Sequence, residues 1–235
     1  SFRSFRFPML HYVSTRNPDL KVSLGEAIAN GIAPDGGLYI PEHFPHFTCR
    51  QFDGDVELPE IGAKLLAPFA EGDQLAAELP EICREAFNFP APLVALDKAP
   101  APASVLELFH GPTSAFKDFG ARFLAASLER LRRSAPKKLT ILVATSGDTG
   151  AAVAAAFHNR PWVEVVVLYP KGLVSQRQAH QLACWGGNVR TFAVRGTFDD
   201  CQRMVKEAFL DPSLAQTHQL SSANSINVGR LLPQM

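Results

Sequence analysis

The sequence has no excess of charge and no long apolar run. Its 235 residues include 23 lysines and arginines and 23 aspartates and glutamates, so the formal net charge is zero. Adjacent basic residues occur only as pairs, so the basic footprint of a nucleic-acid-binding protein is missing. No apolar stretch reaches the roughly 18 residues that a membrane span needs. The first residues, SFRSFRFP, lack the apolar core and cleavage site of a signal peptide. We therefore expect neither a nucleic-acid partner nor a membrane.

Metal-binding and nucleotide-binding motifs are also missing. The four cysteines form no C-x-x-C pair, and no histidine spacing completes a zinc set. This pattern predicts reduced thiols in a cytoplasmic protein that binds no metal. The sequence contains neither the dinucleotide fingerprint G-x-G-x-x-G nor the G-K-[ST] of a Walker A loop.

A change of composition divides the chain near residue 95. A proline-rich stretch over residues 89–103 indicates a connection between two domains. We expect a small, mostly helical N-terminal domain over residues 9–95 and a second domain over residues 96–235. Residues 1–8 precede a more ordinary sequence and are expected to be an extension. In the first domain, Ser23 and Glu26 have the spacing of a capping box at the start of a helix.

The second domain alternates apolar strands with helices. This alternation predicts an α/β fold, in which a twisted parallel sheet is covered by helices on both faces. Ligands of such sheets bind beyond the carboxyl ends of the strands, in the loops that lead into helices. Strands are expected over 104–109, 139–144, 163–168, 189–194 and 218–221, and helices over 114–134, 148–157, 175–185, 199–210 and 226–235.

The loop HGPTSAFKDFG, which follows the first of these strands, places a lysine in an unusual position. Lys117 lies in the first turn of the expected helix, between Phe116 and Phe119. Both the helix dipole and the apolar neighbours disfavour an ammonium group at this point. Such a lysine can act as a nucleophile or form a Schiff base. The alternative is a lysine that extends to water beside two core phenylalanines.

The loop after the second strand is TSGDTG, residues 145–150. Small hydroxyl side chains and glycines at a helix N-terminus can form an anion site, because the N–H groups are free and accessible. The alternative is an ordinary capped helix, with Ser146 or Asp148 as the capping residue.

These stretches together resemble the threonine synthases of the bacterial and fungal branch. HGPTSAFKDFGARF and ATSGDTGAA carry the resemblance, and YVSTR, PDGGLYIPE and SSANSINVGRLLPQM agree in order. Those enzymes depend on pyridoxal 5'-phosphate and have the tryptophan-synthase β-like fold, fold type II. The resemblance implies that Lys117 forms the Schiff base and acts as the catalytic residue. It also implies cofactor contacts at Phe116, Ser146, Gly147, Asp148 and Thr149, and substrate contacts at Thr145, Thr149, Asn224, Ser225 and Arg230.

The reaction implied is the last step of threonine biosynthesis. A carbon–oxygen lyase acting on phosphates would convert O-phospho-L-homoserine and water to L-threonine and phosphate. The cofactor would serve as the electron sink while Lys117 moves protons. The only partner expected is this small-molecule substrate, and we expect a monomer or a homodimer.

Two departures from the family pattern qualify this expectation. Asp148 stands where many relatives of the wider fold have asparagine. The G-N-x-G-D loop that holds the cofactor phosphate is absent, and the chain stops inside a helix at RLLPQM. We therefore expect a C-terminally truncated threonine synthase that alone binds the cofactor weakly and has no useful turnover. The alternatives are a serine/threonine dehydratase, a threonine-synthase-like phospho-lyase, a catalytically silent fragment or homologue, or a nucleotide-binding module.

Overall fold

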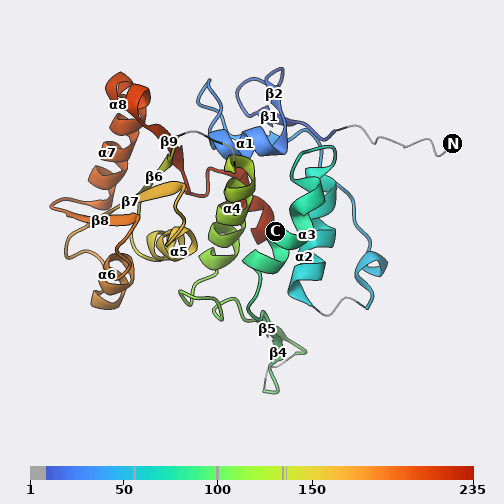
Figure 1. The fold of residues 1–235 in the computed structure, drawn as a ribbon. Helices are drawn as coiled ribbons and strands as arrows, with labels where there is room; N and C mark the ends of the chain where they lie inside the picture. The colour runs from blue at the N-terminus through green and yellow to red at the C-terminus, as the bar shows by residue number, and fades with distance from the viewer. Residues whose placement is uncertain (1–8, 55–56, 99–100, 134, 136) are drawn as a thin grey trace.

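The computed structural model describes residues 9–54, 57–98, 101–133, 135 and 137–235. The expected extension, residues 1–8, lies outside these ranges. A helical N-terminal region occupies one side of the molecule and an α/β region the other, with α4 (Lys117–Arg132) between them (Figure 1).

The N-terminal region combines a small antiparallel sheet with short helices. The capping box is confirmed, because Ser23 accepts from the backbone of Glu26 and the Glu26 side chain accepts from the backbone of Ser23. The sheet has the order β2-β1-β3. Its strands are β1 (Tyr12–Ser14), β2 (Lys21–Val22) and β3 (Tyr39–Pro41). The helices are α1 (Leu24–Asn30), α2 (Leu58–Leu66) and α3 (Leu79–Ala86), with 3-10 turns at Cys49–Phe52, Ala67–Ala70 and Ala76–Glu78.

The second region contains the predicted parallel sheet, with the strand order β8-β7-β6-β9. Because β6 and β9 are neighbours, the loops that follow them emerge at the same edge. The strands are β6 (Leu139–Ala144), β7 (Val163–Pro170), β8 (Val189–Val194) and β9 (Gln219–Ser222). The helices after α4 are α5 (Asp148–Phe157), α6 (Gln176–Ala183), α7 (Phe198–Leu210), α8 (Pro212–Thr217) and α9 (Val228–Leu231), and a 3-10 turn follows at Leu232–Gln234.

Both faces of this sheet are covered, as predicted. Side chains alternate between the faces of a strand. In β6, Ile141 and Val143 join the main core with α4 and α5, whereas Leu142 and Ala144 pack against Val205 and its neighbours in α7. The alanine-rich sequence of α5 lets this helix approach the sheet closely.

One predicted strand of the parallel sheet is wrong. Residues 104–109 contribute β5 (Ser104–Leu106), which pairs with β4 (Leu93–Ala95) in an antiparallel hairpin. The hairpin projects from the body of the molecule, and both of its strands are exposed (Figure 1). Pairing with a strand so close in sequence closes only a short loop, which costs little chain entropy.

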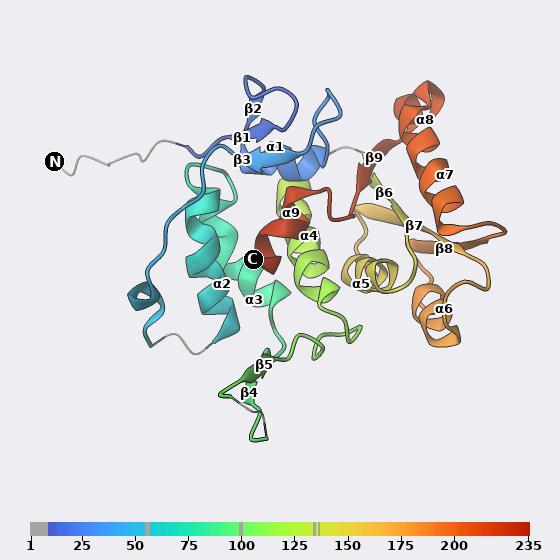
Figure 2. The same cartoon turned by 180° about the vertical axis from the view of Figure 1, so that it is seen from behind.

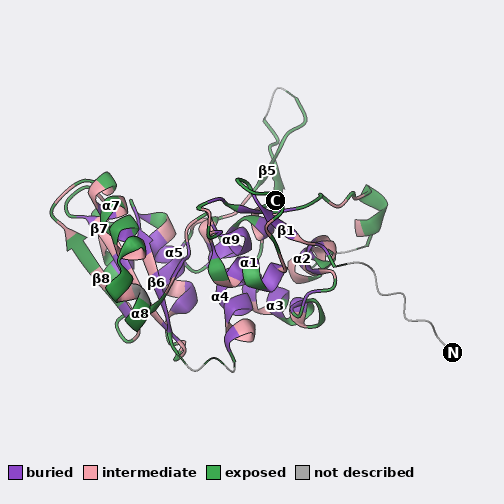
Figure 3. Cartoon of the chain, turned by 90° about the horizontal axis from the view of Figure 1, so that it is seen from above, coloured by how far each residue is buried: buried purple, intermediate pink, exposed green. Residues whose placement is uncertain are grey.

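The core is continuous between the two regions. Figure 3 shows buried residues where α1, α3, α4 and α9 meet. A polar cluster adds to this contact, because Glu85 of α3 accepts from Arg130 of α4 and, at 2.6 Å, from Arg160. Burial alone would raise the pKa of Glu85, but these two guanidinium groups outweigh it and hold the pKa below its usual range. The domain boundary near residue 95 stays a prediction.

Candidate active site

The structure brings the two predicted loops together at Lys117. This lysine is the first residue of α4, and its Nζ lies 3.8 Å from Oδ2 of Asp148, the first residue of α5. The same Nζ lies 4.1 Å from the centroid of the Phe116 ring. A carboxylate and an aromatic face both attract a cation. The lysine side chain is 25% exposed, so it is only partly buried.

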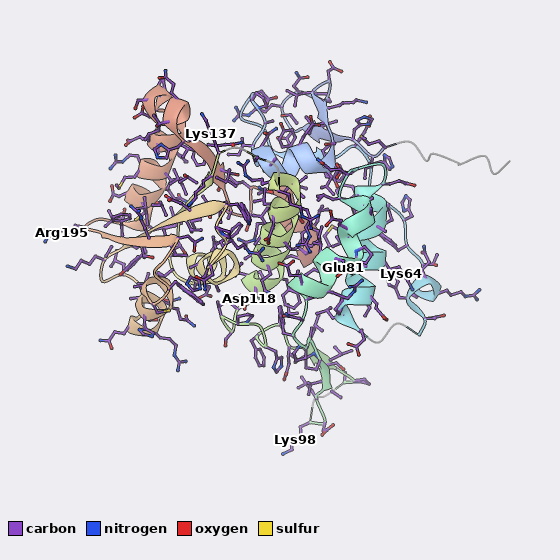
Figure 4. The ribbon with its side chains drawn as sticks, viewed as in Figure 1. Lys64, Glu81, Lys98, Asp118, Lys137 and Arg195 are labelled. Carbon is purple, nitrogen blue, oxygen red and sulfur yellow. The ribbon has the colours of Figure 1, made fainter. Side chains whose placement is uncertain are left out.

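A fully buried carboxylate holds the loop that precedes Lys117. Asp118 accepts hydrogen bonds from the backbone N–H and from the hydroxyl of Thr113, both at 2.8 Å. A Cβ on Gly111 would lie only 2.5 Å from Oδ2 of Asp118, so this glycine allows the close approach. Burial raises the pKa of Asp118, although the bonds from Thr113 oppose the shift. Figure 4 shows Asp118 at the start of α4.

Sequence reasoning did not single out Asp118. The available signal was an acidic residue in the first turn of a helix, where the dipole favours it.

The TSGDTG loop is stabilised from within. The hydroxyl of Thr145 accepts from the N–H of Gly147 at 3.0 Å and from the N–H of Gly150 at 2.9 Å. The buried side chain of Thr145 therefore holds the backbone of this loop in its conformation. Gly147 has a φ of +147°, which favours glycine, and a Cβ there would lie 2.3 Å from Nε2 of Gln178. That same Nε2 donates to Asp148 at 3.0 Å.

A cavity of about 350 Å³ opens beyond the adjacent ends of β6 and β9. It collects five of the residues predicted to contact cofactor or substrate. Hydroxyl and amide groups therefore meet at the N-terminal end of α5, where N–H groups favour an anion. The cavity is lined by Thr145, Ser146, Thr149, Asn224 and Ser225, together with Ala144, Phe198, Gln202 and Ile226.

Arg230 does not line this cavity. Its side chain is fully buried, and Nη1 donates to the carbonyl of Ala223 at 2.6 Å. It therefore lies behind the loop that carries Asn224 and Ser225. Within the described ranges, its Nε and Nη2 have no hydrogen-bond partner. Burial lowers the pKa of Arg230 to about 10, although the charge of Asp118 opposes the shift.

The described parts of the chain contain no group of three or more side chains placed to hold a metal ion. None of the helices in the same ranges combines the length and the apolarity that a membrane crossing requires. The cavity is instead lined by residues with hydroxyl and amide groups, and the amine of Lys117 lies outside that lining, beside Asp148. These groups are suited to an aldehyde and to phosphate oxygens.

A lysine at one helix start and a hydroxyl-rich loop at the next, both beside a parallel sheet, define a ligand-binding α/β protein. Residues 87–230 match the family described as "Pyridoxal-phosphate dependent enzyme", and residues 11–87 match "Threonine synthase N terminus". The chain belongs to the pyridoxal-phosphate-dependent enzyme family. This confirms the predicted fold and, for the family, the predicted cofactor.

The resemblance to threonine synthases is also confirmed. The chain is 45% identical to the threonine synthase of Escherichia coli over 92% of its own length and 50% of that protein. It is 43% identical to the threonine synthase of Haemophilus influenzae over 96% and 52% of the two lengths. The crystal structure of "PLP bound Threonine synthase from Brucella melitensis" superposes with a TM-score of 0.85 at 38% identity, over 96% of this chain and 50% of that one. The chain thus spans about half the length of these relatives.

Proposed function

We propose that the protein is a threonine synthase, which converts O-phospho-L-homoserine and water to L-threonine and phosphate. The observation that carries the proposal is the position of Lys117 at the start of α4, with its Nζ 3.8 Å from Asp148 of the TSGDTG loop. Similarity to threonine synthases extends over nearly the whole chain and supports the same conclusion.

The groups around Lys117 fit pyridoxal phosphate. Lys117 would hold the cofactor covalently through Nζ, with the ring of Phe116 beside that atom. Ser146, Gly147, Asp148 and Thr149 would supply polar contacts from the start of α5. When bound, the cofactor supplies an electron sink for the electron pair at the substrate Cα.

Lys117 is also the residue proposed to move protons. Once its Nζ is free, the amine would take a proton from the substrate Cα and return it later in the reaction. Asp148 faces this amine and would stabilise its protonated form by attraction. Many relatives of the wider fold have asparagine at the position of Asp148, and its uncharged amide would attract the amine only weakly.

The 350 Å³ cavity is the proposed position of the substrate phosphate. The hydroxyls of Ser146, Thr149 and Ser225 and the amide of Asn224 line it and can donate to phosphate oxygens. Thr145 would contribute mainly by shaping the loop. The unpaired N–H groups of Arg230 lie behind the Asn224 loop and fit an additional anionic contact.

The test uses the protein expressed at the full length of its natural reading frame. After incubation with pyridoxal phosphate and reduction with borohydride, peptide mapping should find the adduct on Lys117. Lys117→Ala should abolish the adduct and the release of phosphate from O-phospho-L-homoserine. A control variant at an exposed lysine, Lys171→Ala, should retain both. An adduct elsewhere, or phosphate release that survives Lys117→Ala, would refute the proposal.

A further inference from the structure

Asn227 joins two segments that are 199 residues apart in the sequence. Its Nδ2 donates to the carbonyl of Ile28 in α1 at 3.0 Å, and its Oδ1 accepts from the N–H of Gly229 at 2.9 Å. The side chain is fully buried. The last four carbonyls of a helix lack partners within the helix. Asn227 therefore satisfies a carbonyl at the end of α1 that the helix itself leaves free.

The same residue closes the loop that carries the predicted phosphate contacts. The backbone N–H of Asn227 donates to the carbonyl of Asn224 at 3.0 Å, and its Nδ2 also lies 3.4 Å from the carbonyl of Ser222. The N–H of Asn224 in turn donates to the hydroxyl of Ser222 at 3.2 Å. Residues 222–227 thus form a closed loop, and Nδ2 of Asn227 links its closing residue to α1. A second, longer bond to α1 comes from Ser221, just before the loop, whose hydroxyl donates to the carbonyl of Ala29 at 3.5 Å.

The end of α1 is shaped for this contact. Gly31 ends the helix with a φ of +74°, a conformation that favours glycine. A Cβ at this position would lie 3.2 Å from Nδ2 of Asn227 and would crowd the amide. Figure 2 shows α9, which begins after Asn227, next to α4 and close to α1.

We propose that Asn227 is a positioning residue, which fixes the Asn224–Ser225 side of the phosphate cavity against α1 of the N-terminal region. This inference deepens the proposed function and rests on it for the identity of the phosphate ligand. It assigns a role in substrate affinity to a region whose described residues do not line that cavity.

A serine substitution separates this role from simple helix capping. Serine and asparagine cap helices about equally well, so Asn227→Ser keeps an acceptor for Gly229. The shorter side chain cannot reach the carbonyl of Ile28. A matched control is Asn188→Ser, because Nδ2 of Asn188 also donates to backbone carbonyls, including Phe157 at 2.9 Å. Asn188 precedes β8 and lies at the opposite end of the sheet from the cavity.

The experiment measures inorganic phosphate binding by calorimetry, KM and kcat for O-phospho-L-homoserine, and Tm, all on the protein at its natural length. Asn227→Ser should weaken phosphate binding and raise KM by about fivefold or more, since one hydrogen bond that places the loop is lost. Its kcat should stay within about twofold of the original. Asn188→Ser should lower Tm by a comparable amount and leave phosphate binding and KM unchanged.

The outcomes distinguish this inference from the proposed function. Unchanged phosphate binding and KM in Asn227→Ser would overturn the inference, even if the protein makes threonine. An equal loss of phosphate binding in Asn188→Ser would also overturn it, because the effect would then follow from general destabilisation. Phosphate binding that depends on Asn227, in a protein that does not turn over O-phospho-L-homoserine, would uphold the inference and refute the proposed function. Absence of phosphate binding to the unsubstituted protein would overturn the inference whatever the turnover.

Discussion

Removal of the Asp118 carboxylate should release the loop that precedes Lys117. Asp118→Ala deletes two hydrogen bonds of 2.8 Å and leaves the backbone N–H of Thr113 without its partner. Hydrogen bonds to a charged group contribute about 1.5–3 kcal/mol each. The two are not independent, so we expect a loss of about 3 kcal/mol in the free energy of unfolding.

Asp118→Asn is the informative partner variant. Its amide oxygen can accept from the N–H of Thr113, and its NH₂ can donate to the hydroxyl, which rotates to accept. Both bonds survive in neutral form, and the amide avoids the cost of burying a charge, so we expect a loss of less than about 1 kcal/mol. Asp118→Ala should therefore be the far more damaging change, both to stability and to the yield of the borohydride-reduced adduct at Lys117.

The pH dependence gives a second measurement on the same site. Because burial raises the pKa of Asp118, the stability that this group contributes is present below its unfolded pKa and is lost as the pH rises through the folded pKa. The side chain of Asp118→Asn does not titrate. The unfolding free energy of the unsubstituted protein, relative to that of Asp118→Asn, should therefore be highest at low pH and fall as the pH rises through the folded pKa of Asp118. Urea titrations at several acidic pH values measure it. Equal losses for the alanine and asparagine variants, or a pH-independent difference, would refute the reasoning.

Two further predictions concern Glu85 and Gly147. The pKa of Glu85 is held below its ordinary value of 4.5. The stability that Glu85 contributes should therefore be present above pH 4.5 and be lost as the pH falls through the lowered pKa. In urea titrations at several pH values, Glu85→Gln should lack this acid-sensitive part of the unfolding free energy. Gly147→Ala should lower the free energy of unfolding by about 1–3 kcal/mol and displace Gln178 from its contact. Gly172→Ala, at a φ of +77° with open space around it, should cost only the backbone strain of about 1 kcal/mol, and a larger loss there than in Gly147→Ala would contradict the packing argument.

The elements that sequence predicted best are those whose signal is local. The run LTILVA and the helix of small residues after TSGDTG have the predicted bounds, because a continuous apolar run and a capped, alanine-rich stretch each specify one structure. Residues 104–109 were assigned to the wrong sheet, since strand propensity does not identify the partner strand. The six residues of α8 were not predicted as a helix, because they show no helical period of apolar residues.

In the candidate site, too, the residues with a local sequence signal were predicted and those that depend on distant or backbone partners were not. The motifs predicted a site at Lys117, Asp148 and the hydroxyls of the cavity, and the parallel sheet explains why Asn224 and Ser146 both line that cavity. Asp118 and Asn227 were missed. Their partners are backbone groups, which carry no residue-type signal, and the partner of Asn227 lies far away in the sequence.

The bond between Ile28 and Asn227 has a consequence for the order in which the protein is made. The N-terminal region leaves the ribosome first, yet the carbonyl at the end of α1 must remain solvated until 199 more residues have been added. Contacts of such sequence separation form late in folding. We therefore expect α1 to complete its packing at the same moment as the loop of residues 222–227, so that a nascent chain acquires the proposed substrate cavity and its N-terminal core in a single step.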